Sequence, residues 1–158
     1  MTASSTLRSQ LVQHLKGGMA FMPVEKMIEE IPFKKLGAIP EGLPYSLWQQ
    51  FWHMMYAQKD IVEFSLKSDY TEPAWPDDYW PEEPAPKNQG EWDSAVKEFF
   101  HDREQLIKAI ENDSTDLHAP LKNDPSKTLL REVLLVIEHN AYHTGQLLVI
   151  MRMLDLHN

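Results

Sequence analysis

Two histidines four residues apart stand in an otherwise apolar stretch near the end of the chain. The stretch reads VLLVIEHNAYHTGQLLVIM, and its histidines are His139 and His143. Side chains at positions i and i+4 of an α-helix lie on one face, so both imidazoles can bind a single metal ion. Zinc proteases use this spacing, but there a glutamate directly follows the first histidine, whereas Asn140 does so here. The spacing therefore indicates a metal-binding pair without indicating a protease.

The predicted helix, about 124–155, turns both histidines inward. It should begin near the Asp124-Pro125 pair, a capping residue followed by a proline. A polar stripe recurs every seven residues and marks the solvent side, at Arg131, Glu138, Gly145 and Arg152. His139 and His143 lie about 100° or more from Glu138 in that stripe, and closer to Glu132 and Gln146. From spacing alone, a pair of buried histidines hydrogen-bonded to the backbone, Glu132 or Gln146 explains the pattern as well as a metal site does.

A metal site needs at least one further ligand, and the chain has five other histidines. His118 falls in a loop and His157 is the penultimate residue, so both are weak candidates. His101 falls among charged residues and should be exposed. Two remain: His14 lies on the apolar face of the first helix, where a packed core histidine is expected, and His53 lies beside an aromatic arc, where a surface or edge position is expected. The pattern does not choose between them.

Three neutral imidazoles around a divalent ion leave its charge uncancelled and one coordination position free. Such an ion can lower the pKa of a bound water to about 7, or ionise a bound thiol, and either product is a nucleophile. Zinc and nickel both suit imidazole, whereas a two-histidine iron site would require Glu132 or Asp60 as a ligand. A metal bound by such a set would be a divalent ion, zinc or nickel, with Gln146 and Glu132 as candidate neighbours of the ligands.

The composition limits the partners. With 24 acidic and 15 basic side chains the net charge is −9, which repels nucleic acids and anionic membranes. No run of about 18 apolar residues occurs, as a membrane span requires, and the N-terminal stretch lacks a signal-like apolar segment, so we expect a cytoplasmic protein. There is no cysteine, so any thiol must come from a cosubstrate. We expect a small-molecule substrate, no nucleic acid and no membrane.

The elements that must position these residues are all helical. Apolar periodicity predicts helices at about 4–16, 24–31, 45–67, 91–111 and 124–155, and no segment alternates as a strand does. A chain of 158 residues fits one domain, 1–158. The class expected is therefore all-α.

A long connection, 69–90, separates the helices predicted at 45–67 and 91–111. Its 22 residues, DYTEPAWPDDYWPEEPAPKNQG, include five prolines and two tryptophans. Such a length suits a crossover between neighbouring helices that run in the same direction. Its aromatic residues indicate that it lies against the helices, either as packing or as a wall or lid over a site.

The chain resembles the DinB-like and YfiT-like bacterial proteins. Its segment YSLWQQFWHMM resembles their second-helix histidine segment, and EHNAYHTGQL resembles their fourth-helix H-x-x-x-H-x-x-Q signature. The resemblance covers nearly the whole chain. It implies an up-down-down-up four-helix bundle and a divalent metal site open to solvent, with His53, His139 and His143 as ligands. Gln146 matches a recurring position of the signature.

Family members of known activity include thiol-dependent transferases and isomerases. The resemblance therefore implies a metal-dependent enzyme, a hydrolase or thiol S-transferase, acting on a small molecule and using a low-molecular-weight thiol as cosubstrate. The alternative is a non-catalytic bundle that a metal stabilises and that acts as a binding or structural dimer. A free coordination position favours the enzyme, because structural zinc is normally closed by four protein ligands.

Two of the predicted helices are apolar over so broad an arc that one bundle core is not expected to cover both. The helix at 124–155 is apolar outside its polar stripe, and the helix at 45–67 carries large apolar side chains around its circumference, namely Trp48, Phe51, Trp52, Met54 and Met55. We expect a two-fold homodimer that buries the excess. The alternative is that Trp75 and Trp80 of the connection cover the 45–67 helix within one chain.

Overall fold

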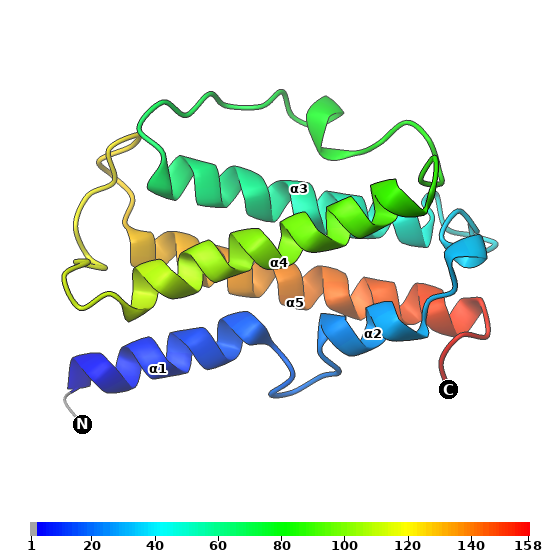
Figure 1. Cartoon of the computed structure of the whole chain (residues 1–158), viewed down its shortest axis with the longest axis horizontal. Coiled ribbons are helices and arrows are strands. Elements are labelled where there is room, and N and C mark those ends of the chain that lie inside the picture. Colours follow the sequence, from blue (N-terminus) through cyan, green and yellow to red (C-terminus); the bar gives the residue numbers. More distant parts are fainter. Residues whose placement is uncertain (1–2) are drawn as a thin grey trace.

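The computed structural model describes residues 3–158, and within them every regular element is a helix (Figure 1). The α-helices are α1 (Ala3–Lys16), α2 (Val24–Glu30), α3 (Leu47–Leu66), α4 (Gln89–Glu111) and α5 (Leu129–Met153). Two 3-10 turns, η1 (Phe33–Lys35) and η2 (Asp77–Tyr79), interrupt the connections. The expected all-α class is confirmed. Among the described residues, none of the helices combines the length and the apolarity that crossing a bilayer requires.

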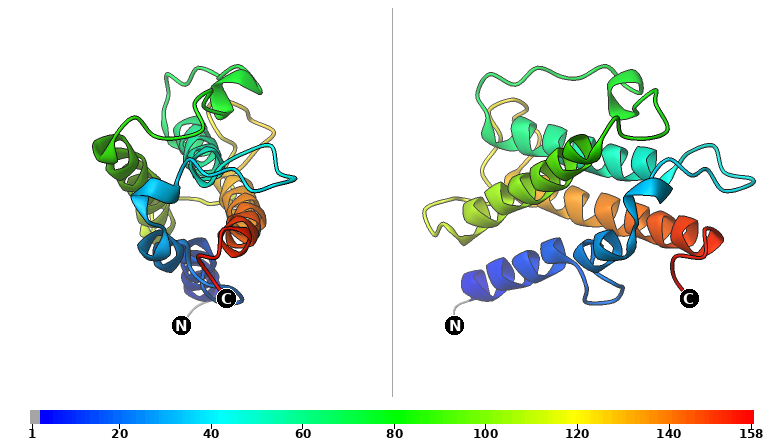
Figure 2. Two further views of the ribbon diagram at one scale, coloured as in Figure 1. Left: turned by 90° about the vertical axis from the view of Figure 1, so that its right-hand side faces the viewer. Right: turned by 45° about the vertical axis from the view of Figure 1, so that its right-hand side comes forward.

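The long helices lie side by side, and α3 is central to the site. Figure 1 shows α3 and α4 running in one direction, with α1, α2 and α5 running in the other. Helix α3 packs against both α4 and α5. The end-on view in Figure 2 shows the connection between α3 and α4 lying outermost, beyond α3. This connection must return along the whole of α3, about 30 Å for 20 residues, which accounts for its length.

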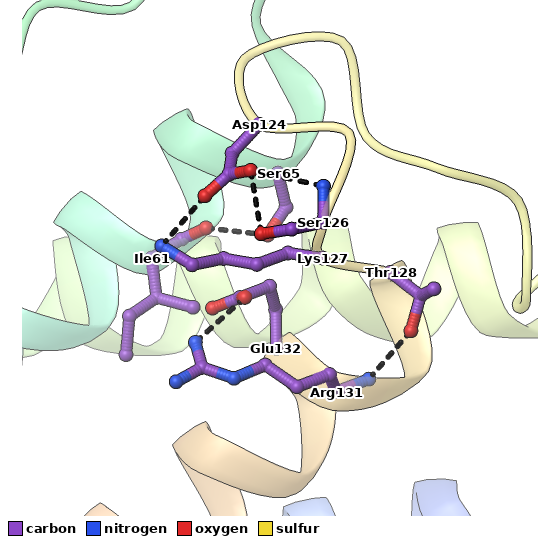
Figure 3. A network of polar contacts seen from close by, with 8 residues as sticks. All are labelled: Ile61, Ser65, Asp124, Ser126, Lys127, Thr128, Arg131 and Glu132. Carbon is purple, nitrogen blue, oxygen red and sulfur yellow. Dashed lines mark hydrogen bonds and ion pairs between the residues drawn. The ribbon is translucent and has the colours of Figure 1, made fainter.

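Side chains at the helix starts fix where the two site-bearing helices begin. Helix α3 starts at a capping box, in which the Ser46 hydroxyl accepts from the Gln49 amide and the Gln49 side chain accepts from the Ser46 amide. Helix α5 starts later than the Asp124-Pro125 pair predicts. The Asp124 carboxylate accepts from the backbone and hydroxyl of Ser126 and so closes a turn, while Thr128 caps the helix (Figure 3). The predicted start at Asp124 was therefore wrong.

The broad apolar arc of α3 is covered within a single chain. Four of the five large side chains on this arc expose at most 4% of their surface, namely Trp48, Phe51, Met54 and Met55, and Trp52 is partly buried against the same core. Aromatic rings of α4 complete this part of the core: the Trp92 ring lies 4.9 Å from that of Phe51, and the Phe99 ring lies 5.5 Å from it. The expectation that α3 leaves an exposed apolar arc was therefore wrong, because side chains of α2, α4 and α5 pack over it.

The connection is fastened along the length of α3. Near the C-terminal end of the helix, Tyr70 and Tyr79 both donate their hydroxyl hydrogens to Asp60, at 2.7 and 2.6 Å. At the other end the connection meets the segment that precedes α3. A Cβ on Gly37 would lie 2.6 Å from the Cβ of Ala85, so the approach of these two backbones requires a glycine there.

Candidate metal centre

Three histidines from two helices point their ring nitrogens at one another in the middle of the α3–α5 interface. Helix α3 supplies His53, and α5 supplies His139 and His143. The Nε2 atom of His53 lies 3.2 Å from the Nε2 atom of His143 and 3.2 Å from that of His139. One ligand atom from each residue falls within 4.8 Å of the other two.

This spacing fits a single divalent ion. Two nitrogens that each lie about 2.05 Å from one tetrahedral ion are about 3.3 Å apart, close to the separation between these Nε2 atoms. Helix α5 supplies two of the three atoms because its i and i+4 positions share a face. No fourth histidine or carboxylate joins the group among residues 3–158.

The outer nitrogens of two rings are held by hydrogen bonds that turn the inner nitrogens toward the centre. His53 Nδ1 donates to the backbone carbonyl of Tyr79 at 3.3 Å, and His143 Nδ1 lies 2.6 Å from Oε1 of Gln146. The Tyr79 carbonyl can only accept, so Nδ1 of His53 carries the proton and its Nε2 keeps a lone pair. Nδ1 of His143 is held between the side chains of Gln146 and Gln50, at 2.6 and 2.7 Å. The Nε2 lone pair of His53 therefore faces the ring nitrogens of the other two histidines and is free to bind a cation.

Burial keeps the histidines neutral. His53 is 3% exposed and His143 is 8% exposed. Burial, with added repulsion from His143, lowers the pKa of both His53 and His139 to about 4, and burial also lowers the pKa of His143. Neutral imidazole is the form that binds metal, so these ligands need not lose protons at neutral pH.

The connection forms one wall of this centre. The Trp80 ring stacks on the His53 ring, with 4.2 Å between centroids and 3° between planes. Trp75 meets the same ring edge-on at 6.3 Å while keeping 69% of its own surface exposed. The connection therefore packs against α3 and also walls the centre, so both roles considered for it apply.

The sequence of this chain also matches a known protein family. The model of the DinB superfamily matches residues 22–147, which include α2, α3, α4 and the three histidines. The chain belongs to the DinB superfamily. Neither the curated proteins nor the solved structures contain a significant match.

Of the other residues that the sequence analysis considered near the metal centre of this DinB-superfamily chain, one contacts a histidine and two do not. Gln146 contacts His143, as one reading of the pattern proposed. Glu132 does not reach the histidines: it lies two helical turns before His139, and its carboxylate pairs with Arg131 at 2.7 Å. Asp60 is likewise occupied by its two tyrosine hydroxyls.

The two histidines between which the pattern could not choose exchange their expected environments. His14 was expected in the core and is exposed, whereas His53 was expected at a surface or edge and is buried. His101 and His118 are exposed, and His157 pairs with Glu30 at 2.8 Å, away from the centre.

Two neighbours of the centre, Gln50 and Tyr79, were not anticipated from the sequence, whereas Trp80 lies over α3 as one alternative for the connection predicted. Gln50 places its side-chain nitrogen 2.7 Å from His143 Nδ1, and its position three residues before His53 on one helical face could have indicated it. Tyr79 acts through its backbone carbonyl, which no side-chain pattern reveals. Trp80 stacks on His53 only because the connection folds back over α3.

Proposed function

We propose that this DinB-superfamily protein is a divalent-metal-dependent enzyme that acts on a small molecule through an open three-histidine centre. The observation that carries the proposal is the convergence of the Nε2 atoms of His53, His139 and His143 with no fourth ligand among the described residues. Structural zinc is normally closed by four protein ligands, so a three-ligand centre favours chemistry over a purely structural role.

The reaction classes that fit are hydrolysis and transfer to or from a low-molecular-weight thiol. A zinc or nickel ion held by three neutral imidazoles brings the pKa of a bound water or thiol toward neutrality, which both classes need. The thiol would be a cosubstrate, because the chain has no cysteine.

The side chains around the centre would orient the ligands and limit water. The Tyr79 carbonyl and the Gln146 side chain fix the ring planes of His53 and His143. Trp80 covers one face of the His53 ring and excludes water from that side.

Metal analysis on the purified full chain tests the ligand set. After chelation and reloading with Zn²⁺ or Ni²⁺, we expect about one ion per chain, with strong loss of affinity in His53→Ala, His139→Ala and His143→Ala. The matched control is His14→Gln, which changes an exposed histidine and should retain the metal. Stoichiometric metal in His53→Ala, or metal loss in His14→Gln, would show that the third ligand was assigned wrongly.

A reactivity screen tests catalysis separately from metal binding. The metal-loaded chain is assayed for thiol consumption with an aryl halide and for ester hydrolysis, each against His139→Ala. Activity that requires the metal and His139 supports the enzyme. Full metal occupancy without turnover of any probe would favour a metal-stabilised bundle that binds a partner.

An exposed apolar stripe on α5 favours a homodimer as the state in which the protein works. The stripe comprises large side chains with 46–64% of their surface exposed, namely Leu134, Tyr142, Val149 and Met153. Gly145 lies among them, and apart from the backbone of its own helix no atom of the described residues lies within 4 Å of where its Cβ would be, so a second helix could approach closely there. Glu138 lies seven residues before Gly145, and Arg152 lies seven residues after it. If the α5 helices of two chains pair antiparallel about Gly145, Glu138 of each chain therefore lies opposite Arg152 of the other.

We also propose that the chain is one domain, an up-down-down-up four-helix bundle in which α2 continues α1. The parallel course of α3 and α4 and the long connection between them support this topology.

A further inference from the structure

A cavity of about 580 Å³ lies between α3 and α5, apart from the histidine centre. Its apolar lining includes Phe64, Tyr70 and Leu135, and its charged lining includes Lys127, Arg131 and Glu132. The volume is within the range of small-molecule sites, about 300 to 1,000 Å³.

The cavity and the centre both lie along the interface of α3 and α5. Asp60, at the cavity, follows His53 by seven residues on α3, and Glu132, at the cavity, precedes His139 by seven residues on α5. Because α3 and α5 run in opposite directions, both steps lead the same way, by about 10 Å along the helix axes. Leu135, one turn from His139, lines the cavity on the side of the centre.

The charges that line the cavity favour a cationic ligand. The lining holds four carboxylates and two basic groups, and both basic groups already have acidic partners. Lys127 lies 3.3 Å from Asp124 and 4.8 Å from the centre of the Phe64 ring, and Arg131 lies 2.7 Å from Glu132. The formal charge of the lining is therefore −2, with no basic group left over for an anion.

Glu132 supplies the specific anchor. Its side chain is only 2% exposed, and Oε1 accepts from Arg131 (Figure 3). In the described part of the chain no hydrogen bond reaches Oε2, the second oxygen of this buried carboxylate. Oε2 is not among the fully buried atoms without a partner, so this oxygen is accessible, and a ligand that donates a hydrogen bond to it from the cavity gains a charge-assisted contact.

We propose that this cavity binds the ammonium or guanidinium end of the small molecule on which the centre acts. The ligand class is an organic cation about 10 Å long, with an apolar body against Phe64, Tyr70 and Leu135 and its reacting group directed to the histidines. This inference rests on the proposed function for the reacting end, whereas the recognition of the cation by Glu132 does not require a metal.

Isothermal titration of the full chain tests the cavity with three probes that share a phenylethyl body: 2-phenylethylamine, 2-phenylethanol and 3-phenylpropionate. The titrations use chelator-treated protein and Zn²⁺-loaded protein. We expect the amine to bind at least tenfold more tightly than the alcohol or the carboxylate. Glu132→Gln, which keeps the shape and the Arg131 contact, should weaken amine binding at least tenfold, while the exposed control Glu104→Gln should not change it.

The remaining variants separate this inference from the metal proposal. His139→Ala should lose metal but keep amine binding, so metal loss alone does not count against the cavity. Arg131→Gln removes the hydrogen bond to Oε1 of Glu132, so amine binding should be kept or strengthened. This variant tests the role of Glu132 even if Glu132→Gln fails to fold, because a loss of amine binding in it would contradict the inference. Equal binding of amine and alcohol, preference for the carboxylate, amine binding unaffected by Glu132→Gln, or no binding of any probe would overturn the inference.

Discussion

Removing the hydroxyl of Tyr79 should loosen both the connection and the metal ligand beneath it. The hydroxyl donates to Asp60 at 2.6 Å, and the carbonyl of the same residue accepts from Nδ1 of His53. Burial, and then the hydrogen bond to Asp60, raises the pKa of the phenol, so it remains a donor at any ordinary pH. A hydrogen bond to a charged group contributes about 1.5 to 3 kcal/mol net, so Tyr79→Phe should favour opening of the connection by about 2 kcal/mol.

Tyr70 provides a matched comparison within the same connection. Its hydroxyl donates to the other oxygen of Asp60 at 2.7 Å, but no hydrogen bond joins Tyr70 to His53 in the described structure. Tyr70→Phe should therefore loosen the connection by a similar amount, about 2 kcal/mol or roughly thirtyfold in the opening equilibrium. Only Tyr79→Phe should also weaken metal binding, by about tenfold, the lower end of the effect of losing a partner that orients a ligand.

Two measurements separate these effects. Hydrogen exchange reports opening of the connection at 69–90, and metal titration reports the centre. Equal loss of metal affinity in Tyr70→Phe and Tyr79→Phe would refute a role for the Tyr79 carbonyl. Unchanged exchange in both variants would refute the role of Asp60 in fastening the connection.

Three further predictions concern stability and assembly. Burial, and then repulsion from Glu98, raises the pKa of Asp102 to about 6 from an ordinary value near 3.8, so the folded state loses stability as the pH rises through that window. Urea denaturation should then find Asp102→Asn more stable than the native chain by about 1 to 3 kcal/mol at pH 8, with little difference at pH 4. Zn²⁺ at about a hundred times its dissociation constant should raise the free energy of unfolding by about 2.7 kcal/mol and the melting temperature by about 5 to 11 °C, and His143→Ala should abolish the shift in a melting experiment. Sedimentation should give about 37 kDa, twice the 18.4 kDa chain; Glu138→Arg should give the monomer, and its combination with Arg152→Glu should restore the dimer, whereas a native chain of 18 kDa would reject the α5 interface.

The inward position of the α5 histidines was predictable because a regular helix fixes angles between its own residues. The polar stripe that recurs every seven residues along α5 is exposed at all four of its positions, whereas His143, on another face of the helix, is buried. The i, i+4 spacing then places His139 and His143 at one point. These relations are local, so they need no knowledge of the neighbouring elements.

The environment of His53 was not predictable in this way, because it depends on a segment distant from α3. The helical pattern places His53 at the flank of an apolar arc, and an uncovered flank would be a surface position. The connection covers that flank with Trp80, stacked on the ring, and with the Tyr79 carbonyl. The family resemblance selected His53 where the periodicity could not. The start of α5 was predicted wrongly for a different reason. Asp124 and Thr128 are both good capping residues, and only the structure shows which of the two caps the helix.

Buried polar atoms without partners occur near the centre. Among residues 3–158 they include Oε1 of Gln50 on α3 and Oγ1 of Thr144 on α5, both within one turn of a ligand histidine. Each such atom costs about 1 to 3 kcal/mol, in a fold whose net stability is typically about 5 to 15 kcal/mol. An apolar core would avoid that cost, so a sequence that keeps these atoms here gives up stability at one point of the molecule. Proteins break packing rules in this way mainly at functional sites, which is the expectation if the α3–α5 interface binds a metal at one point and the cationic end of its substrate at another.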